Sequence, residues 1–477
     1  MTRARRLRNR RNRLATAGMT VYDAGSSTSC VPMDNTNKPE VSVPRATLDL
    51  KDAVALVVGI VIGAGIFRLP ALVAGNTGTA ETMMFAWILG AVVSFMGALC
   101  YAELASAHPN AGGEYHFLER AYGTEVSRLF AWARMTVIAP GSIALFAFLF
   151  ADYATQFQKL GDASNIIYAG LLIIILTAVN IIGLNAGKWT QNLLTLVEAS
   201  GLVLVIVVGF ATTAPPEPVA AAPGPQGAFG LAMVFVLLTY GGWNDAAYLS
   251  AEIKDGKRNI VRALMYGLGI VAVLYILVGF AYIHGLGMTG LAKAQAPAAE
   301  LMSRAFGETG VKIMSIIVAV AAITSANATI LTGARTNYAL GRDWSLFKWI
   351  GAWHGEKSVP VNAMIVQCLI SLTLVGVAMN QDKGAQGVQN MVDYTAPVFW
   401  LFFFLVAVSI FVFRRWEPAS SRPFTVPLYP FTPLIFSGMC IYMLYSSLAY
   451  TGSGALYGVG LLSIGALLVL FKPRRAK

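Results

Sequence analysis

The chain has 477 residues, of which 56% are hydrophobic and only 12% are charged, whereas a soluble domain carries about 25% charged residues. This composition excludes an ordinary soluble globular protein and predicts a polytopic membrane protein. The formal net charge of +11 is not concentrated in a soluble basic domain, so nucleic acid is not an expected partner.

Residues 1–50 are polar and rich in Arg, Ser, Pro and Asn, and they lack the apolar stretch of a secretory signal peptide. We predict a disordered, basic cytoplasmic tail. Two alternatives stay open, namely a mitochondrial transit peptide and a true start at Met19 or Met33. The second alternative leaves it open whether residues 1–32 are translated.

After this tail, about twelve apolar runs are long enough to cross a membrane, because the ~30 Å hydrocarbon core takes roughly 20 residues per helix. The predicted spans are 52–74, 81–106, 126–154, 165–183, 190–212, 228–250, 262–286, 311–338, 361–379, 391–413, 431–450 and 454–472. The expected fold class is therefore an all-α polytopic membrane protein, with the lipid bilayer as its surroundings.

Basic residues predict the orientation of these spans. If the N-terminus is cytoplasmic, the loops on that side hold Arg120, Lys188, Lys254, Lys257, Arg258, Arg262, Arg342, Lys348, Lys357, Arg414, Arg415 and Arg422. The loops on the other side hold only Lys159, Lys293, Arg304, Lys312 and Lys383. We expect both termini, including the basic C-terminus 473–477, in the cytoplasm, and the protein in the plasma or inner membrane.

The first span contains a glycine-rich run, GIVIGAGIF, at Gly59–Phe67. Gly59 and Gly63 alone form a G-x-x-x-G pair that is typical of close helix packing. Gly65 and Pro70 follow, however, and this denser run favours a break in the helix. A break within the membrane exposes backbone groups that a solute can satisfy. The amino end of the second half would offer amides to an anion such as a carboxylate.

The fifth span carries Glu198 within an apolar sequence, TLVEASGLVLVIVVG. Ionisable groups are costly inside a membrane, so each is a functional candidate. Glu198 could bind a proton or a cation and so couple its movement to transport. The alternative left open is a structural carboxylate that is hydrogen-bonded to a neighbouring helix.

The sixth span contains a second glycine interruption, LLTYGGWND, at Leu237–Asp245. If this backbone is open, the carbonyls of Leu238 and Gly241 become acceptors for an ammonium group, and Tyr240 could cover the ligand, with Thr239 beside it. The alternative is a packed kink filled by an aromatic side chain. Breaks at matching places in the two halves suit a zwitterion.

Other polar residues in or near the spans have open roles. Thr324 and Ser325 in the eighth span offer hydroxyls to a sodium ion, but such residues also hydrogen-bond helices together, which we favour. Four charged residues complete this group, and they are Arg68, Glu103, Arg134 and Glu252. Arg68 would sense substrate charge or pair with a fixed acid, Arg134 would snorkel or line the inner vestibule, and the two glutamates favour a gate or a structural ion pair.

Enzyme, metal and disulfide signatures are absent from the sequence. The four histidines are scattered and form no HExxH motif, and neither a nucleophile elbow nor a phosphate-binding glycine loop is present. The four cysteines show no CxxC spacing. We therefore expect no enzymatic activity, no cofactor and no metal site.

Five motifs in order carry a resemblance to a known family. They are GIVIGAGIFRLPALVA, YAELASAHPNAGGEYHFLERAYG, TYGGWNDAAYLSAEIKDGKRNI, ARTNYALGRD and RPFTVPLYPFTPLIF. Together they resemble the amino acid-polyamine-organocation (APC) superfamily, and its amino acid permeases in particular, over residues 45–472. The resemblance implies a core of ten helices at 51–413, built as two inverted repeats of five with discontinuous helices 1 and 6. It also implies that residues 414–472 form a cytoplasmic loop and two peripheral helices.

The resemblance further implies where the substrate binds. Its carboxylate would contact the amides of Ala64, Gly65 and Ile66, and its amine the carbonyls of Val61, Leu238 and Gly241. Gly63, Thr239 and Tyr240 belong to the same expected site. Some proton-coupled members carry a lysine at the position of Glu198, near the place that sodium occupies in sodium-coupled relatives. The chain departs from the family at Gly256 and Val261, where proline is common, and this concerns only the shape of a cytoplasmic turn.

The expected function is secondary active transport of amino acids by alternating access, with proton coupling or exchange. Sodium is the other candidate coupling ion. A substrate-sensing or channel-like protein of the same fold and a polyamine or amine transporter are the alternatives. The sequence leaves open which amino acid is carried, symport against exchange, the coupling ion, the oligomeric state and any accessory subunit.

Overall fold

The structure, a computed structural model, describes residues 48–110, 112–182, 188–214, 228–245, 253–353, 359–379, 386–418, 420, 422–450 and 453–470. Residues 44–477 belong to one compact unit. The predicted tail lies outside the described residues except for its last three positions. Glu252 and the C-terminal segment 473–477 also lie outside them.

Helices make up nearly all the regular structure, which confirms the all-α prediction. The first half holds α2 Leu50–Val61, the 3-10 helix η1 Ala64–Phe67, α3 Leu69–Thr77, α4 Ala80–Ala107, α5 Gly113–Tyr122, α6 Thr124–Ala133, the π-helical turn η2 Arg134–Ile138, α7 Ala139–Ala154, α8 Ser164–Ile182 and α9 Lys188–Ala211. The second half holds α10 Ala228–Thr239, α11 Gly256–Leu286, α12 Met288–Lys293, α13 Pro297–Asp343, η4 Ser345–Phe347, α14 Val361–Met379, α15 Gly387–Trp416, α16 Phe431–Ala449 and α17 Ser453–Leu470. Within the described residues, the only β pairing is an isolated bridge between Leu48 and Ile253.

The described helices account for the twelve predicted spans. Nine of them are long and apolar enough to cross a membrane, and the shorter apolar segment Gly454–Leu470 of α17 supplies the twelfth span. The first span is divided into α2, η1 and α3, and the sixth span is represented by α10, which ends at Thr239. These two are the spans in which the sequence predicts breaks, and both breaks are confirmed.

Helix α5 was not predicted, and α11 and α13 begin earlier in the chain than the predicted seventh and eighth spans. Helix α5 lies between the second and third spans and was not predicted, because its ten residues are too few and too polar to resemble a span. Its Glu114, Phe117, Leu118 and Ala121 are buried at helical spacing, so one face packs on the core. Helix α13 starts well before the predicted residue 311, but Gly307, with φ 57°, separates that first part from the span.

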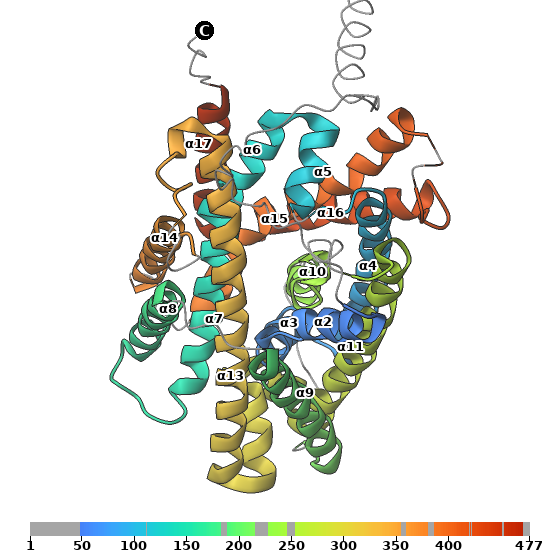
Figure 1. Ribbon diagram of the computed structural model, residues 1–477. Helices are drawn as coiled ribbons and strands as arrows, with labels where there is room; N and C mark the ends of the chain where they lie inside the picture. Colours follow the sequence, from blue (N-terminus) through green and yellow to red (C-terminus); the bar gives the residue numbers. More distant parts are fainter. Residues whose placement is uncertain are drawn as a thin grey trace, which may run out of the picture. The chain divides into compact units, whose positions relative to one another are not determined.

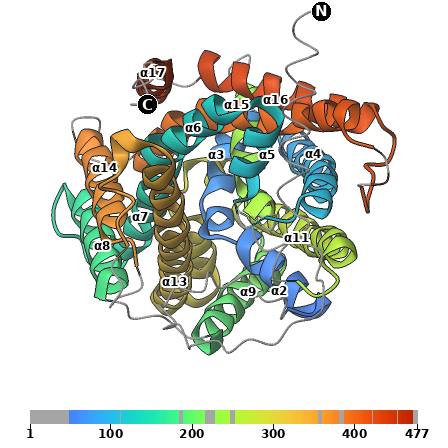
Figure 2. The same cartoon turned by 45° about the horizontal axis from the view of Figure 1, so that its top comes forward.

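The packing of the helices repeats when each span is exchanged with the span five further along the chain. The first span packs on the seventh (α2 on α11), and correspondingly the sixth packs on the second (α10 on α4). The fifth packs on the eighth (α9 on α13), and the tenth on the third (α15 on α7). The third and eighth (α7 and α13), and the fourth and ninth (α8 and α14), lie side by side in Figures 1 and 2. Because each repeat has five spans, an odd number, the second repeat enters the membrane from the opposite side and is inverted.

The sixth span lies in the interior of this arrangement, and Figure 1 shows α10 among α3, α4, α15 and α16. All seven residues from Leu231 to Leu237 are buried, as expected for a helix that is hydrophobic on every face. Helix α8, in contrast, exposes Leu171, Ile174 and Ile175, which suits contact with lipid. The break at the end of α10 therefore lies inside the protein, away from lipid.

Candidate transport site

The break in the first span begins directly after Val61. Ile62 (φ −70°, ψ 89°) and Gly63 (φ −110°, ψ 175°) leave the helical conformation, and η1 then forms a short 3-10 turn. Ala64, Gly65 and Ile66 are the first three residues of η1. A helix leaves its first N–H groups without intrahelical acceptors, so the predicted carboxylate contacts lie at a helix start, as the sequence suggests.

The break in the sixth span is a tight turn. The amide of Gly241 donates to the carbonyl of Leu238 at 3.1 Å, and the amide of Asp245 donates to the carbonyl of Gly242 at 2.9 Å. Gly242 has φ +101°, a conformation that residues with a side chain rarely adopt. The chain therefore cannot continue as a helix through this position.

The two breaks lie against each other. A Cβ atom added to Gly242 would lie 2.8 Å from the carbonyl oxygen of Ile60, and one added to Gly65 would lie 4.0 Å from Cγ2 of Thr239. The structure thus brings together the two glycine runs, which are nearly two hundred residues apart in the chain. Every predicted substrate-binding residue belongs to this contact region or directly adjoins it.

Tyrosine hydroxyls satisfy two carbonyls at the break of the first span. The hydroxyl of Tyr275 in α11 donates to the carbonyl oxygen of Val61 at 2.8 Å, and that of Tyr153 in α7 donates to the carbonyl oxygen of Phe67 at 2.6 Å. The carbonyl of Val61 also accepts the amide of Gly63 at 2.9 Å. Both acceptor positions of the Val61 carbonyl are thus filled by the protein. Sequence reasoning missed these tyrosines, although a tyrosine in an apolar span is itself a signal, since its hydroxyl needs a partner.

Tyr240 follows α10 at the break, and its ring is fully buried. The ring packs between Trp87 of α4 and Tyr275 of α11, with centroid distances of 5.8 and 5.1 Å. Its hydroxyl oxygen is buried and has no hydrogen-bond partner among the described residues. Because buried polar groups are normally hydrogen-bonded, this hydroxyl is a candidate to hydrogen-bond a ligand at the site.

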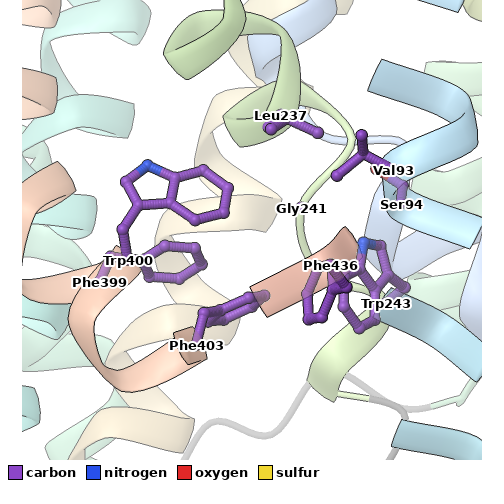
Figure 3. A pocket seen from close by; sticks show the side chains of 9 residues that line it. All are labelled: Val93, Ser94, Leu237, Gly241, Trp243, Phe399, Trp400, Phe403 and Phe436. Carbon is purple, nitrogen blue, oxygen red and sulfur yellow. The ribbon is translucent and has the colours of Figure 1, made fainter. Parts of the chain in front are cut away.

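A small cavity borders the break of the sixth span, and Figure 3 shows the side chains around it. Gly241 lies at its edge, and aromatic rings from α15, α16 and the turn after α10 surround it. The lining residues are Val93, Ser94, Leu237, Gly241, Trp243, Phe399, Trp400, Phe403 and Phe436. The volume of this cavity is ≈ 10 Å³, which is about the room of one water molecule. No amino acid side chain fits without movement of α10 or α15, and the lining carries no charge.

Glu198 lies in α9 with 2% of its surface exposed. Its Oε1 atom is buried without a hydrogen-bond partner among the described residues, and Thr324 of α13 is a neighbour of the carboxyl. The Thr324 hydroxyl donates to the carbonyl oxygen of Val320 at 2.9 Å. The proton of the Thr324 hydroxyl is thus engaged within α13.

The helices that carry Glu198 and the two predicted hydroxyls flank the first break. A Cβ atom on Gly59 would lie 3.1 Å from Cγ2 of Thr195 in α9, and one on Gly63 would lie 3.4 Å from Oγ of Ser325 in α13. Ser325 thus lies beside the break of the first span, and Glu198 and Thr324 lie on the helices that flank it. No group of three or more His, Cys, Asp or Glu residues is arranged to hold a metal ion in the part of the chain that the structure describes.

The remaining charged candidates form ion pairs. Glu103 accepts from Nε of Arg414 at 2.8 Å, which supports the structural ion pair among its alternatives. Arg68 pairs with a fixed acid, Asp152, at 3.4 Å. Arg134, whose side chain is 11% exposed, contacts Glu114 at 3.5 Å and Asp245 at 3.9 Å.

Comparison with known proteins places the whole arrangement in context. The profile of the family described as "Amino acid permease" matches residues 48–465. The chain is 27% identical to b(0,+)-type amino acid transporter 1 of Oryctolagus cuniculus over 400 residues, which cover 82% of this chain and 80% of that protein. It is 26% identical to the serine/threonine exchanger SteT of Bacillus subtilis over 85% of this chain and 91% of that protein. It is 27% identical to large neutral amino acids transporter small subunit 2 of Rattus norvegicus over 91% of this chain and 82% of that protein.

Proposed function

The chain belongs to the amino acid permease family, and from this premise we propose that it exchanges amino acids across the plasma membrane by alternating access. Its family and its apolar helices make it a multi-pass membrane transporter and not an enzyme. The observation that carries the proposal is the meeting of the two broken spans, where a Cβ atom added to Gly242 would lie 2.8 Å from the carbonyl oxygen of Ile60. Paired breaks in inverted repeats are the usual place of a transporter's substrate site.

The substrate's carboxylate binds at the start of η1, at Ala64, Gly65 and Ile66, where backbone amides and the positive end of the helix favour an anion. The amine binds to carbonyls of the two breaks, at Val61, Leu238 and Gly241, with Gly63 and Thr239 next to it. Because Tyr275 and Gly63 fill the Val61 carbonyl, the arriving ammonium displaces the Tyr275 hydroxyl. Tyr240 then offers its hydroxyl, which has no partner among the described residues, to the bound substrate or to Tyr275.

Exchange is supported by the relative SteT, which is named a serine/threonine exchanger. Glu198 adds a proton to the cycle, and its burial in an apolar helix, with Oε1 unpartnered among the described residues, supports this role. Sodium at Glu198, Thr324 and Ser325 is the competing arrangement.

The proposed transport core consists of ten spans within residues 51–413. Residues 414–472 form its periphery, and both termini face the cytoplasm.

The test is counterflow in proteoliposomes that contain the purified full chain. Vesicles are loaded with unlabelled serine, leucine or arginine, and uptake of the same labelled amino acid is measured. An exchanger shows uptake accelerated by internal amino acid, whereas a sensor or a channel shows no acceleration. Uptake of putrescine in place of amino acids would favour the amine transporter.

The variant Gly65→Leu ties this activity to the site. A Cβ atom at Gly65 would lie 3.3 Å from Cδ1 of Leu69 and 4.0 Å from Thr239, so a leucine side chain would fill the space between the breaks. We expect loss of counterflow with normal membrane insertion. Gly376→Leu is the matched control, because a Cβ atom at Gly376 meets nothing within 4 Å. Normal counterflow by Gly65→Leu would exclude the proposed carboxylate site.

A further inference from the structure

The third span, Thr124–Ala154, contacts a charged residue directly after each of the two breaks. Arg68 is the first residue after η1, and Asp245 is the last described residue of the turn that follows α10. These residues have opposite charges, and so have their partners on the third span. Arg68 pairs with Asp152 at 3.4 Å, and Asp245 pairs with Arg134 at 3.9 Å.

The first cluster surrounds Arg68, whose side chain is 9% exposed, and Asp152, whose side chain is 5% exposed. The second guanidinium contact of Arg68 is from Nη1 to the carbonyl oxygen of Ala294 at 3.3 Å, in the link between α12 and α13. The other carboxylate oxygen of Asp152 accepts from Nδ2 of Asn165 in α8 at 2.8 Å. This cluster thus connects η1 and α3 to α7, α8 and the start of α13.

The second cluster surrounds Arg134, whose side chain is 11% exposed. Besides Asp245, Arg134 contacts Glu114 of α5 at 3.5 Å. Glu114 also accepts from the hydroxyl of Tyr101 at 2.6 Å and from Nδ2 of Asn244 at 3.4 Å. This cluster thus connects the turn after α10 to α4, α5 and the third span, and Arg134 begins the π-helical turn η2, an irregularity that is frequent at functional sites.

The two clusters lie toward opposite ends of the third span. Residues 134 and 152 are 18 positions apart in one helical segment, which corresponds to about 27 Å. Helix α7 packs with α8, α13 and α14, whereas the broken spans pack with α4 and α11. Each cluster therefore joins one broken span to the third span, and the first does so beside the hydrogen bond from the Tyr153 hydroxyl to the carbonyl oxygen of Phe67.

The ion pairs that the described residues form between Arg68 and Asp152, and between Arg134 and Glu114 or Asp245, are long. Charge-assisted N–H···O contacts are typically 2.7–2.9 Å, a range that the pair Arg414–Glu103 reaches at 2.8 Å, while those of the clusters measure 3.4–3.9 Å. A buried pair holds its helices together because separation leaves charges without partners. A long pair does so weakly, and such a contact can form and break during a transport cycle.

We propose that Asp152 and Arg134 are positioning residues of the transport cycle, which latch the segments after the first and the sixth break to the third span. Release of the Arg68–Asp152 latch lets α3 move and opens the end of the site near Ala154. Release of the Arg134–Asp245–Glu114 latch lets the turn after α10 move and opens the end near Thr124. The inference rests on the proposed function, because it assigns the latches to the two openings of that site.

Hydrogen exchange on the full chain in lipid nanodiscs tests the latches without any transport measurement. Asp152→Asn should speed amide exchange in α3 by about fivefold and leave Gly241–Asp245 unchanged, since loss of a weak ion pair raises local opening by about that factor. Arg134→Gln should do the reverse. Glu103→Gln is the control, because it removes a buried ion pair that touches neither break, so any change from its lower stability should be equal in the two segments. Equal changes in both segments of the latch variants, or none, would overturn the proposal.

A charge exchange guards against variants that merely fold badly. Each single variant, Arg134→Asp or Asp245→Arg, should speed amide hydrogen exchange in Gly241–Asp245. The double variant restores opposite charges and should return the hydrogen-exchange rate toward the parent value. If the double variant is no slower than the single ones, the latch is excluded. Counterflow in the same proteins separates the two ideas. If the parent protein shows no counterflow but the variants change hydrogen exchange in the expected segments, only the transport proposal is refuted. If counterflow is normal but neither segment responds to the variants, only the latches are refuted.

Discussion

At the scale of single residues, Glu198 is a buried carboxyl on a helix that flanks the proposed substrate site. It lies one helical turn from Thr195 and from Gly201, and those two positions pack on Gly59 and Phe67 at the first break. Glu198 therefore lies on α9 between two positions that contact the first break. This position suits control of coupling better than recognition of the substrate.

We expect Glu198→Gln to keep substrate binding and exchange and to lose accumulation driven by a pH gradient. Glutamine resembles the protonated carboxyl and cannot release a proton. The measurement is uptake in proteoliposomes with inward proton and sodium gradients applied separately. Sodium-driven uptake by the parent that ignores pH would assign Glu198 to a cation, and unchanged accumulation by the variant would remove it from coupling.

Gly242 is a residue that the break itself requires. Its φ of +101° and the carbonyl of Ile60, 2.8 Å from an added Cβ atom, both exclude a side chain. Gly242→Ala should lower stability by roughly 1–3 kcal/mol from backbone strain alone and should abolish transport. Thermal unfolding in detergent and counterflow measure the two effects. Gly376→Ala is the control and should be neutral or slightly stabilising, because alanine is the better helix former; equal melting temperatures of the two variants would contradict the strained turn.

At the scale of elements, the ends of α4 and α15 are clamped together near the link to α16. Glu103 of α4 accepts from Arg414 of α15 and from the amide of Val426 at 2.6 Å. The guanidinium of Arg414 lies 3.8 Å from the ring centre of Tyr429. The link before α16 is thus fixed to the second span by one carboxylate.

Glu103→Gln should lower the melting temperature more than it lowers substrate affinity. The amide keeps one acceptor oxygen, but its NH₂ group would face the N–H donors of Arg414 or Val426, and breaking a buried pair costs about 3–5 kcal/mol. Lys254→Gln is the control, because the exposed pair Lys254–Asp49 contributes about 1 kcal/mol or less. A melting temperature of Glu103→Gln equal to that of the control would show that the clamp is not structural.

At the scale of the whole molecule, the packing joins the spans into two groups around the breaks. Helices α7, α8, α13 and α14 pack on one another, as do the broken first and sixth spans with α4 and α11. Alternating access requires relative movement of such groups. Which group opens toward the cytoplasm depends on the orientation that the basic loops predict.

Labelling from one side of the membrane tests that orientation. Lys159 and Lys348 are both exposed and lie in loops predicted on opposite sides. In a chain without its native cysteines, Lys159→Cys should react with a membrane-impermeant maleimide in intact cells, whereas Lys348→Cys should react only after permeabilisation. The reverse pattern would invert the proposed topology, and reaction of both in intact cells would contradict the number of spans between them.

The sequence by itself determined the twelve spans, their helical class and the position of both breaks. Apolar length and glycine runs act locally: a bilayer must be crossed by about 20 residues that satisfy their own backbone, and two successive glycines, Gly241 and Gly242, weaken a helix. Glu198 stood out for the same reason, since a charge in an apolar run is visible without a fold.

Only the tertiary structure decided which groups meet at these breaks. Tyr275 and Tyr153 reach the carbonyls of Val61 and Phe67 from α11 and α7, and the partners of Arg68 and Arg134 come from segments distant in the chain. Helix α5 and its Glu114 escaped prediction because a short amphipathic helix gains its stability from packing rather than from its own sequence. Contacts of this kind depend on how helices are arranged in space, which periodicity and composition do not encode.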